Sequence, residues 1–129
     1  MLEVYIDGAS AGNPGPSGIG IFIKGEGQHV KISEPIGITN NHQAEFIALL
    51  RGLEEALKIG STFVSMRSDS KIVVSSIDKA YVKNEEFKPY LEKALALIEQ
   101  FELFFIKWIP DKENKAADVL AREAILKNT

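Results

Sequence analysis

Hydrophobic and polar residues alternate in the first part of the chain. Every second position of residues 2–7 (LEVYID) is apolar, which is the period of a β-strand with one buried face. Residues 18–24 (GIGIFIK) form a second segment of this kind, and a Gly-Glu-Gly turn leads into a third near residues 28–36. Because short connections join these strands, the pattern predicts an antiparallel meander.

After residue 38 the spacing of apolar residues becomes helical. Between residues 39 and 60, leucine and phenylalanine recur three or four positions apart, which predicts a long amphipathic helix. Residues 39–41 offer capping side chains for its start, and Gly60 is a natural C-terminal stop. A strand over residues 62–69 and a short helix over residues 70–77 follow.

Three more elements complete the chain. Residues 88–101 carry a second helical stripe, residues 103–109 (LFFIKWI) form a last strand, and residues 115–127 form a closing helix. The order β-β-β-α-β-α-α-β-α predicts an α/β fold with a five-stranded mixed sheet and helices on its faces. Neither a linker nor an internal repeat is visible, so we expect residues 1–129 to form a single domain.

Composition narrows the class of protein. The chain has 129 residues, 45% of them hydrophobic and 26% charged, which is ordinary for one globular domain. It has no cysteine, which excludes disulfides and metal sites with thiolate ligands. Without a secretory signal or a membrane-spanning apolar run, we expect a soluble cytoplasmic protein that does not bind membranes. The net charge of −3 argues against nonspecific attraction to nucleic acid, but not against a nuclease that approaches phosphate through bound metal.

Four acidic residues lie at the ends of predicted elements. Asp7 and Asp69 each end an apolar strand, and ligands in α/β sheets bind outside the carboxyl ends of strands. Glu45 lies in the first turns of the long helix, and Asp118 lies among small residues near the start of the last one. If these carboxylates converge, they need cations, and Mg²⁺ is a natural choice because it prefers oxygen ligands.

Each of these acids also has an ordinary explanation when taken alone. Asp7 and Asp69 could be turn residues, and either Asp69 or Ser70 could cap the short helix. Glu45 could interact only with the helix dipole, and Asp118 could face solvent. Only the combination of the four favours a metal site.

Four stretches of the chain contain these acids in a recognisable order. They are YIDGASAGNPGPSGIG, TNNHQAEFIALLRGL, SDSKIVV and IKWIPDKENKAADVLAREA. Together they resemble the opening strand and glycine-rich loop, the Asn-rich helix start, the Asp-Ser pair and the closing Asp helix of the ribonuclease H type 1 family. The resemblance runs from Leu2 to Ala124.

The resemblance implies an RNase H-like sheet with helices on both faces, and it also implies a nuclease activity. The family cuts the RNA strand of RNA–DNA hybrids with two Mg²⁺ or Mn²⁺ ions, leaving 5′ phosphates. By the same resemblance, Asp7 would bridge both ions, Glu45 and Asp69 would complete the first site, and Asp118 would help to hold the second. We expect a monomer without an obligate protein partner.

Five further positions match places where the family contacts its substrate: Asn13, Asn41, His42, Ser70 and Lys71. Asn13 lies in a glycine-rich segment, residues 8–17, that we expect to be a loop reaching a nucleic-acid groove; it could also be a plain connector. His42 stands where the family usually has a second Asn, and it could simply be an exposed residue at a helix start.

Besides His42, the sequence departs from the family pattern in two further places. The segment before Asp118 (PDKENKAAD) lacks the histidine of well-known bacterial members, and residues 81–90 lack their basic protrusion. These departures leave two alternatives open. One is a related domain that binds nucleic acid but cleaves it poorly, and the other is a nuclease for another substrate, such as duplex RNA or a DNA intermediate. We expect Trp108 and the nearby Phe104 and Phe105 to be core residues rather than stacking platforms.

Overall fold

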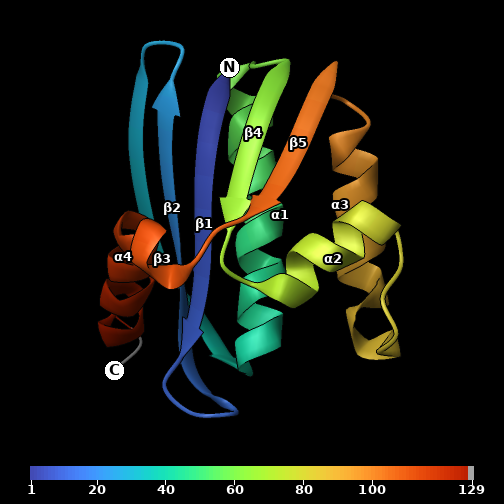
Figure 1. The fold of residues 1–129 in the computed structure, drawn as a ribbon. Coiled ribbons are helices and arrows are strands. Elements are labelled where there is room, and N and C mark those ends of the chain that lie inside the picture. Colours follow the sequence, from blue (N-terminus) through green and yellow to red (C-terminus); the bar gives the residue numbers. More distant parts are fainter. Residues whose placement is uncertain (128–129) are drawn as a thin grey trace.

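The computed structural model describes residues 1–127, in which five strands form a sheet of order β3-β2-β1-β4-β5 (Figure 1). The strands are β1 (Leu2–Ser10), β2 (Gly15–Gly25), β3 (Gln28–Thr39), β4 (Phe63–Ser68) and β5 (Leu103–Trp108). The helices are α1 (Asn41–Ile59), α2 (Lys71–Lys79), α3 (Lys88–Ile98) and α4 (Lys115–Leu126), with short 3-10 turns at Glu85–Phe87 and Asp111–Glu113. The predicted order of elements and the α/β class are confirmed.

The sheet is mixed, as expected. β1, β2 and β3 pair antiparallel, whereas β4 runs parallel to β1 and β5 runs parallel to β4. Helix α4 packs in front of β1, β2 and β3 in Figure 1, α1 lies behind the sheet, and α3 packs against α1. Because β1 and β4 are parallel neighbours, their carboxyl ends reach the same edge of the sheet.

The core lies between the sheet and α1. Leu2, Val4 and Ile6 of β1 are at most 1% exposed, which confirms the alternation seen in the sequence. A Cβ on Gly52 of α1 would lie 2.8 Å from the Ile6 side chain, so α1 approaches this face closely. The odd-numbered residues of β1 therefore point to the opposite face, where α4 lies.

Polar caps determine where α1 and α2 begin. The Asn40 side chain accepts a hydrogen bond from the Gln43 N–H (2.8 Å), and the Gln43 side chain accepts one from the Asn40 N–H (3.1 Å). This capping box starts α1 and places Glu45 in its second turn. Ser70 caps α2 by accepting from the Val73 N–H, so the Asp69 carboxylate does not serve as the cap.

The glycine-rich segment is shorter as a loop than expected. We expected residues 8–17 to be a loop, but β1 continues to Ser10 and β2 begins at Gly15. Pairing of Gly8 with Ile19 and of Ser10 with Ser17 extends the hairpin almost to its tip. Only residues 11–14 connect the two strands. Gly8 is therefore not a turn residue; it lies in β1, where the lack of a side chain lets α1 pack closely.

The expectation of buried aromatic residues on β5 is wrong for two of three positions. Trp108 is 40% exposed and Phe105 is 52% exposed, whereas Phe104 packs partly buried against the core. Phe105 points to the face on which α4 lies, and α4 does not extend over β5.

No helix in the described residues has the length and apolar character needed to cross a bilayer.

Candidate active site

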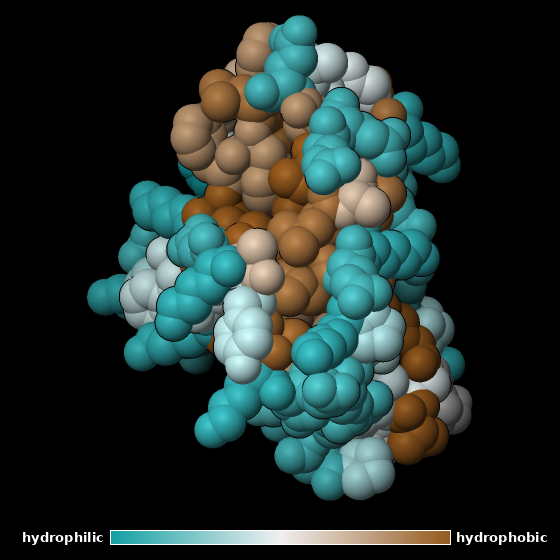
Figure 2. Space-filling view, turned by 90° about the vertical axis from the view of Figure 1, so that its right-hand side faces the viewer, coloured by the Kyte–Doolittle hydropathy of each residue, from teal (hydrophilic) through white to brown (hydrophobic). Residues whose placement is uncertain are grey.

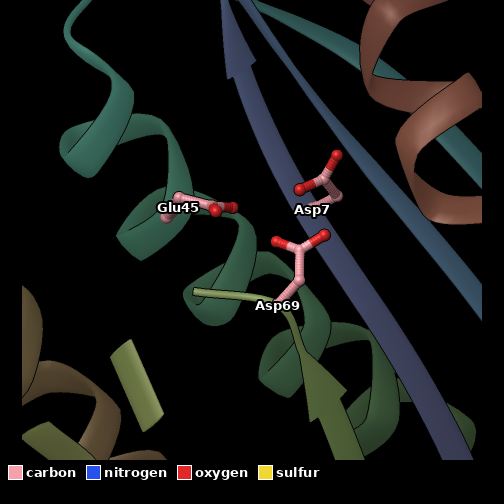
Figure 3. Close-up of side chains that lie close together, drawn as sticks. All are labelled: Asp7, Glu45 and Asp69. Carbon is pink, nitrogen blue, oxygen red and sulfur yellow. The ribbon is translucent and has the colours of Figure 1, made fainter. Parts of the chain in front are cut away.

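Three carboxylates meet at the carboxyl ends of β1 and β4 (Figure 3). Asp7 lies on β1, Asp69 directly follows β4, and Glu45 reaches toward both from α1. One oxygen from each side chain lies within 4.8 Å of the others. Asp7 is only 5% exposed, so the cluster combines like charges with burial.

A close contact between α1 and β1 positions Glu45. A Cβ on Gly8 would lie 2.3 Å from the carbonyl carbon and oxygen of Ala44, so only glycine allows this approach. At this distance the Gly8 N–H donates a hydrogen bond of 2.6 Å to Glu45 Oε1. The residue after the first acid therefore orients the second.

The three acids hold protons more tightly than ordinary carboxylic acids. Burial and the negative charges of Glu45 and Asp69 raise the pKa of Asp7 to about 10. Burial and the charge of Asp69 raise the pKa of Glu45 to about 8, although the Gly8 hydrogen bond opposes this. Burial also raises the pKa of Asp69. No salt bridge in the described part of the chain neutralises any of the three.

Asp118 approaches this cluster from α4 but does not belong to its tight centre. Protonated Asp7 donates a hydrogen bond to Asp118, which contributes to the raised pKa of Asp7, and both residues line the same hollow. Arg122, one turn later on α4, donates from Nε to both Asp118 carboxylate oxygens at 3.1 Å. The fourth predicted acid is thus beside the first, and it is the one with a cationic partner.

Asn114, a residue that the sequence reasoning missed, connects the segments that carry Asp7, Asp69 and Asp118. Its side chain is 1% exposed, and Nδ2 donates to the Ile6 carbonyl (2.9 Å) and to Asp69 Oδ2 (3.3 Å). Its own carbonyl accepts the Asp118 N–H at 3.0 Å. An Asn four positions before the last acid was the available signal, but it resembles an ordinary helix start.

The donor set fits hard divalent cations. All the converging ligand atoms are carboxylate oxygens, the chain has no cysteine, and oxygen-only sites suit Mg²⁺ or Mn²⁺. A divalent cation would offset the repulsion that raises the pKa values of Asp7 and Glu45. The Asn114 side chain contacts Asp69, and its Oδ1 is buried without a hydrogen-bond partner in the described residues. This oxygen could accept a hydrogen bond from a water molecule bound to an ion.

Two hollows flank the acids. The larger, about 720 Å³, includes Asp7, Asp69 and Asp118 in its lining, together with Asp111 and Arg122. The smaller, about 520 Å³, is lined by Gly8, Asn41, His42, Glu45, Asp69, Ser70, Lys71 and Ile72. Four of the five predicted substrate contacts therefore share one hollow with two of the acids; their contact with substrate stays a prediction.

The remaining predicted contact, Asn13, lies at the exposed tip of the β1–β2 hairpin. Its Oδ1 accepts a hydrogen bond of 3.1 Å from the Asn41 N–H, so it ties the hairpin tip to the start of α1. On the other wall, the Lys71 ammonium lies 5.2 Å from the centre of the Trp108 ring. The Trp108 Nε1–H donates to the Asp69 carbonyl at 3.1 Å, so the exposed tryptophan braces this wall.

We expect Asn114→Ala to weaken both folding and metal binding. The substitution leaves the Ile6 carbonyl without a buried donor, which costs about 1–3 kcal/mol of unfolding free energy. It also releases Asp69, and the loss of such a supporting hydrogen bond lowers metal affinity about 10–100-fold. Thermal unfolding and calorimetric titration of the metal-free protein with Mn²⁺ measure the two effects.

Asn84→Ala is the matched control for this prediction. Asn84 also caps a short turn, accepting from the Glu86 N–H at 2.9 Å, but it is exposed. Its loss should cost about 0.5–2 kcal/mol and leave Mn²⁺ affinity unchanged. Equal Mn²⁺ affinities for Asn114→Ala and the wild type would show that Asn114 supports the fold alone.

Known proteins resemble this chain over nearly its whole length. A family model described as "Reverse transcriptase-like" matches residues 5–124. A protein of Enterococcus faecalis named "Putative hydrolase EbsB" is 44% identical over 129 residues, covering 98% of this chain and 96% of that protein. Ribonuclease HI of Halobacterium salinarum is 35% identical over 127 residues, but the chain spans only 64% of its length.

Solved structures agree with the sequence relationships. The crystal structure of RNase H1 from Halobacterium salinarum superimposes with a TM-score of 0.91 at 34% identity, and 98% of each chain is covered. LC11-RNase H1, solved in complex with an RNA/DNA hybrid, gives a TM-score of 0.90 at 35% identity, again over 98% of each chain. The shared sheet, the acidic cluster at its edge and these relatives lead to one assignment: the chain belongs to the ribonuclease H type 1 family.

Proposed function

We propose that this ribonuclease H hydrolyses the RNA strand of RNA–DNA hybrids with two bound divalent cations, Mg²⁺ or Mn²⁺, and leaves 5′-phosphate products. The observation that carries the proposal is the cluster of Asp7, Glu45 and Asp69, whose oxygens lie within 4.8 Å of one another. A buried cluster of unneutralised acids destabilises the fold by itself. Such a cluster is useful where cations and a phosphodiester must be held together.

Each acid has a part that follows from its position. Asp7, between Asp69 and Asp118, would contact both ions; Glu45 and Asp69 would complete one site, and Asp118 would help to hold the other. When bound, the ions supply activation of water and stabilisation of the leaving 3′ oxygen in an in-line displacement. The chain's own contribution is orientation, because Gly8 fixes Glu45 and Asn114 fixes Asp69 through hydrogen bonds.

Arg122 has a separate part in this proposal. In the absence of substrate its guanidinium holds Asp118, while it also lines the larger hollow beside Asp7 and Asp69. A guanidinium is suited to contact phosphate oxygens in a fork geometry. Arg122 would therefore keep Asp118 in place beside the scissile phosphate.

Hybrid recognition would use the smaller hollow. Asn41, His42 and Lys71 offer an amide, an imidazole and a cation beside Glu45 and Asp69. Ser70 lies beside them; its hydroxyl accepts the Val73 N–H and keeps its own O–H to donate to substrate. The relative LC11-RNase H1 has been solved with an RNA/DNA hybrid, which supports a hybrid as the substrate.

Proton transfer must proceed without the histidine of well-known bacterial members. The turn before α4 instead places Asp111 in the lining of the larger hollow. Asp111 is exposed, so its carboxylate is open to solvent and to the hollow. It is the residue of this turn that could replace the histidine in leaving-group protonation or product release.

A cleavage assay tests the proposed function. End-labelled RNA–DNA hybrid, duplex RNA and duplex DNA are incubated with the protein in Mg²⁺ and in Mn²⁺, beside Asp69→Asn. We expect metal-dependent cleavage of the hybrid alone, lost in Asp69→Asn, with 5′-phosphate ends on the products. Tight hybrid binding without cleavage in either metal would replace the proposal with a binding domain, and cleavage of duplex RNA or DNA would change the substrate.

A further inference from the structure

Part of the sheet face on which α4 packs is uncovered. A Cβ on Gly20 would lie 2.0 Å from the Ala117 carbonyl, so α4 sits directly on the row of the sheet that pairs Gly20 with Asp7. Beyond this row, toward the amino ends of β1 and β4, no helix lies in front of the sheet in Figure 1. We call this uncovered area the open face.

Two rows of paired residues make up the open face. The row next to Asp7 runs Lys107, Arg67, Tyr5, Phe22 and Lys31 across the five strands. The following row runs Phe105, Ser65, Glu3, Lys24 and His29, and Phe63 and Leu103 lie beyond it. Aromatic and cationic side chains therefore lie together on one sheet surface that begins beside the acidic cluster.

The aromatic side chains on the β4–β5 half are accessible. Phe63 is 45% exposed and Phe105 is 52% exposed. Figure 2, which looks onto the molecule from the side of β5 and α3, shows an apolar area with hydrophilic residues around it. Such a contiguous apolar area on a soluble protein commonly marks a binding surface.

The charge of the open face is opposite to that of the chain. It carries Lys24, Lys31, Arg67 and Lys107 against one acid, Glu3, whereas the whole chain has a net charge of −3. Arg67 already binds Glu3 at 2.5 Å. Within the described residues, neither Lys31 nor Lys107 forms a salt bridge, so both are available to an anionic ligand.

Several contacts restrain the cations in the middle of the open face. The Tyr5 ring lies between two cations, with Lys24 Nζ at 5.6 Å and the Arg67 guanidinium at 5.2 Å from its centre. Arg67 also donates to the Tyr5 hydroxyl at 2.7 Å. These contacts hold the cations in place between the flanking phenylalanines, which reduces the entropy lost when a ligand binds.

We propose that the open face binds single-stranded nucleic acid, with bases stacked on Phe105 and Phe63 and phosphates near Lys107, Lys24 and Lys31. Aromatic rings and cations on a flat sheet suit such a strand because every base has a stackable face and every linkage carries a charge. An acidic protein as the ligand would also bind the cations, but it would gain less from the accessible aromatic rings between them. The open face adjoins Asp7, so an unpaired strand leaving the active site would reach it directly.

Binding of fluorescent single-stranded oligothymidylate, followed by anisotropy at low salt in EDTA, tests this proposal without any metal or cleavage. We expect Phe105→Ala to weaken binding about 5–150-fold, which is the loss of one base stack. Lys107→Ala and Lys31→Ala should each lower the slope of log affinity against log salt by about 0.7. Lys107 is exposed, so its substitution does not threaten folding, and circular dichroism checks Phe105→Ala.

Two substitutions outside the open face are the matched controls. Ile38→Ala removes an exposed apolar residue at the end of β3, and Lys93→Ala removes an exposed cation of α3; both should bind like the wild type. Unchanged oligonucleotide binding by Phe105→Ala and Lys107→Ala overturns the proposal. So does equally tight binding of polyglutamate, or a dimer in light scattering that Phe105→Ala dissociates.

The outcome is separable from that of the proposed function. Failure to cleave hybrids would leave the metal-free binding result intact, because the binding assay does not use the acidic cluster. If both proposals hold, Phe105→Ala should cleave a blunt hybrid at the wild-type rate. It should show a raised KM only for a hybrid with a single-stranded overhang.

Discussion

Replacing Asp7 with asparagine is expected to reduce hybrid cleavage by at least a factor of about 1000 and, in the same protein, to stabilise the metal-free fold. The carboxylate offers charged oxygens to the proposed ions, and losing about 4 kcal/mol of their stabilisation costs about a thousandfold in rate. Without metal, however, burial and the negative charges of Glu45 and Asp69 raise the pKa of Asp7 to about 10, so at neutral pH this carboxyl must take up a proton when the chain folds. An amide is already neutral and avoids this cost, so the unfolding free energy should rise by about 2 kcal/mol or more.

Opposite changes in activity and stability distinguish a metal ligand from a structural acid. Urea unfolding in EDTA measures stability, and initial rates on labelled hybrid measure activity. Asp78→Asn makes the same chemical change at an exposed position of α2, and it should alter neither quantity measurably. If Asp7→Asn destabilised the metal-free protein, Asp7 would be part of a favourable native interaction, and the assignment as a ligand would lose its basis.

The arrangement of the three central acids could be predicted because it depends on topology. Strand periodicity placed Asp7 and Asp69 at the ends of two strands, and helical periodicity placed Glu45 early in α1. Resemblance to the family then supplied an RNase H-like mixed sheet, and in the structure β1 and β4 are parallel neighbours in it, which brings these ends together. The position of each acid within its own element was sufficient, because the fold brings those elements to one edge.

Asn114 could not be found in this way because its role depends on distant partners. Locally it is an Asn before a helix, which sequence patterns interpret as a cap. Its side chain instead reaches the Ile6 carbonyl, 108 positions away. Nothing in the spacing of residues 110–118 indicates that a carbonyl of β1 needs a donor there.

The β5 aromatics show a second limit of periodicity. Alternation predicts which residues share a face, but it does not say whether a helix covers that face. Phe104 and Phe105 differ in this respect alone: Phe104 faces the core, whereas Phe105 faces the area that α4 does not reach. The length and position of α4 decide the exposure, and they follow from packing of Ala117 and Ala121 on Gly20.

The stability of the metal-free protein is expected to fall by more than about 2 kcal/mol as the pH rises from 5 to 9, since one pKa unit corresponds to about 1.4 kcal/mol. The pKa values of Asp7 and Glu45 are raised to about 10 and about 8, so the folded state binds protons more tightly than the unfolded chain. Stability from this source is complete below their ordinary values near 4 and is lost as the pH rises through the raised values. At acid pH the opposite holds for Glu3 and Glu34, whose pKa values arginine partners lower, so stability should also decline below about pH 4.5.

Divalent metal should prevent most of this loss of stability at alkaline pH. Cations that bind the deprotonated acids of the folded state stabilise it by about 2.7 kcal/mol at one hundred times the dissociation constant. Urea titrations between pH 5 and 9, with EDTA or with Mg²⁺, should therefore diverge as the pH rises. Asp7→Asn should flatten the EDTA curve because it removes the group with the most strongly raised pKa. A wild-type stability in EDTA that stayed constant or increased over this range would mean that the acids are already neutralised without metal, and the electrostatic basis of the proposed two-ion site would be lost.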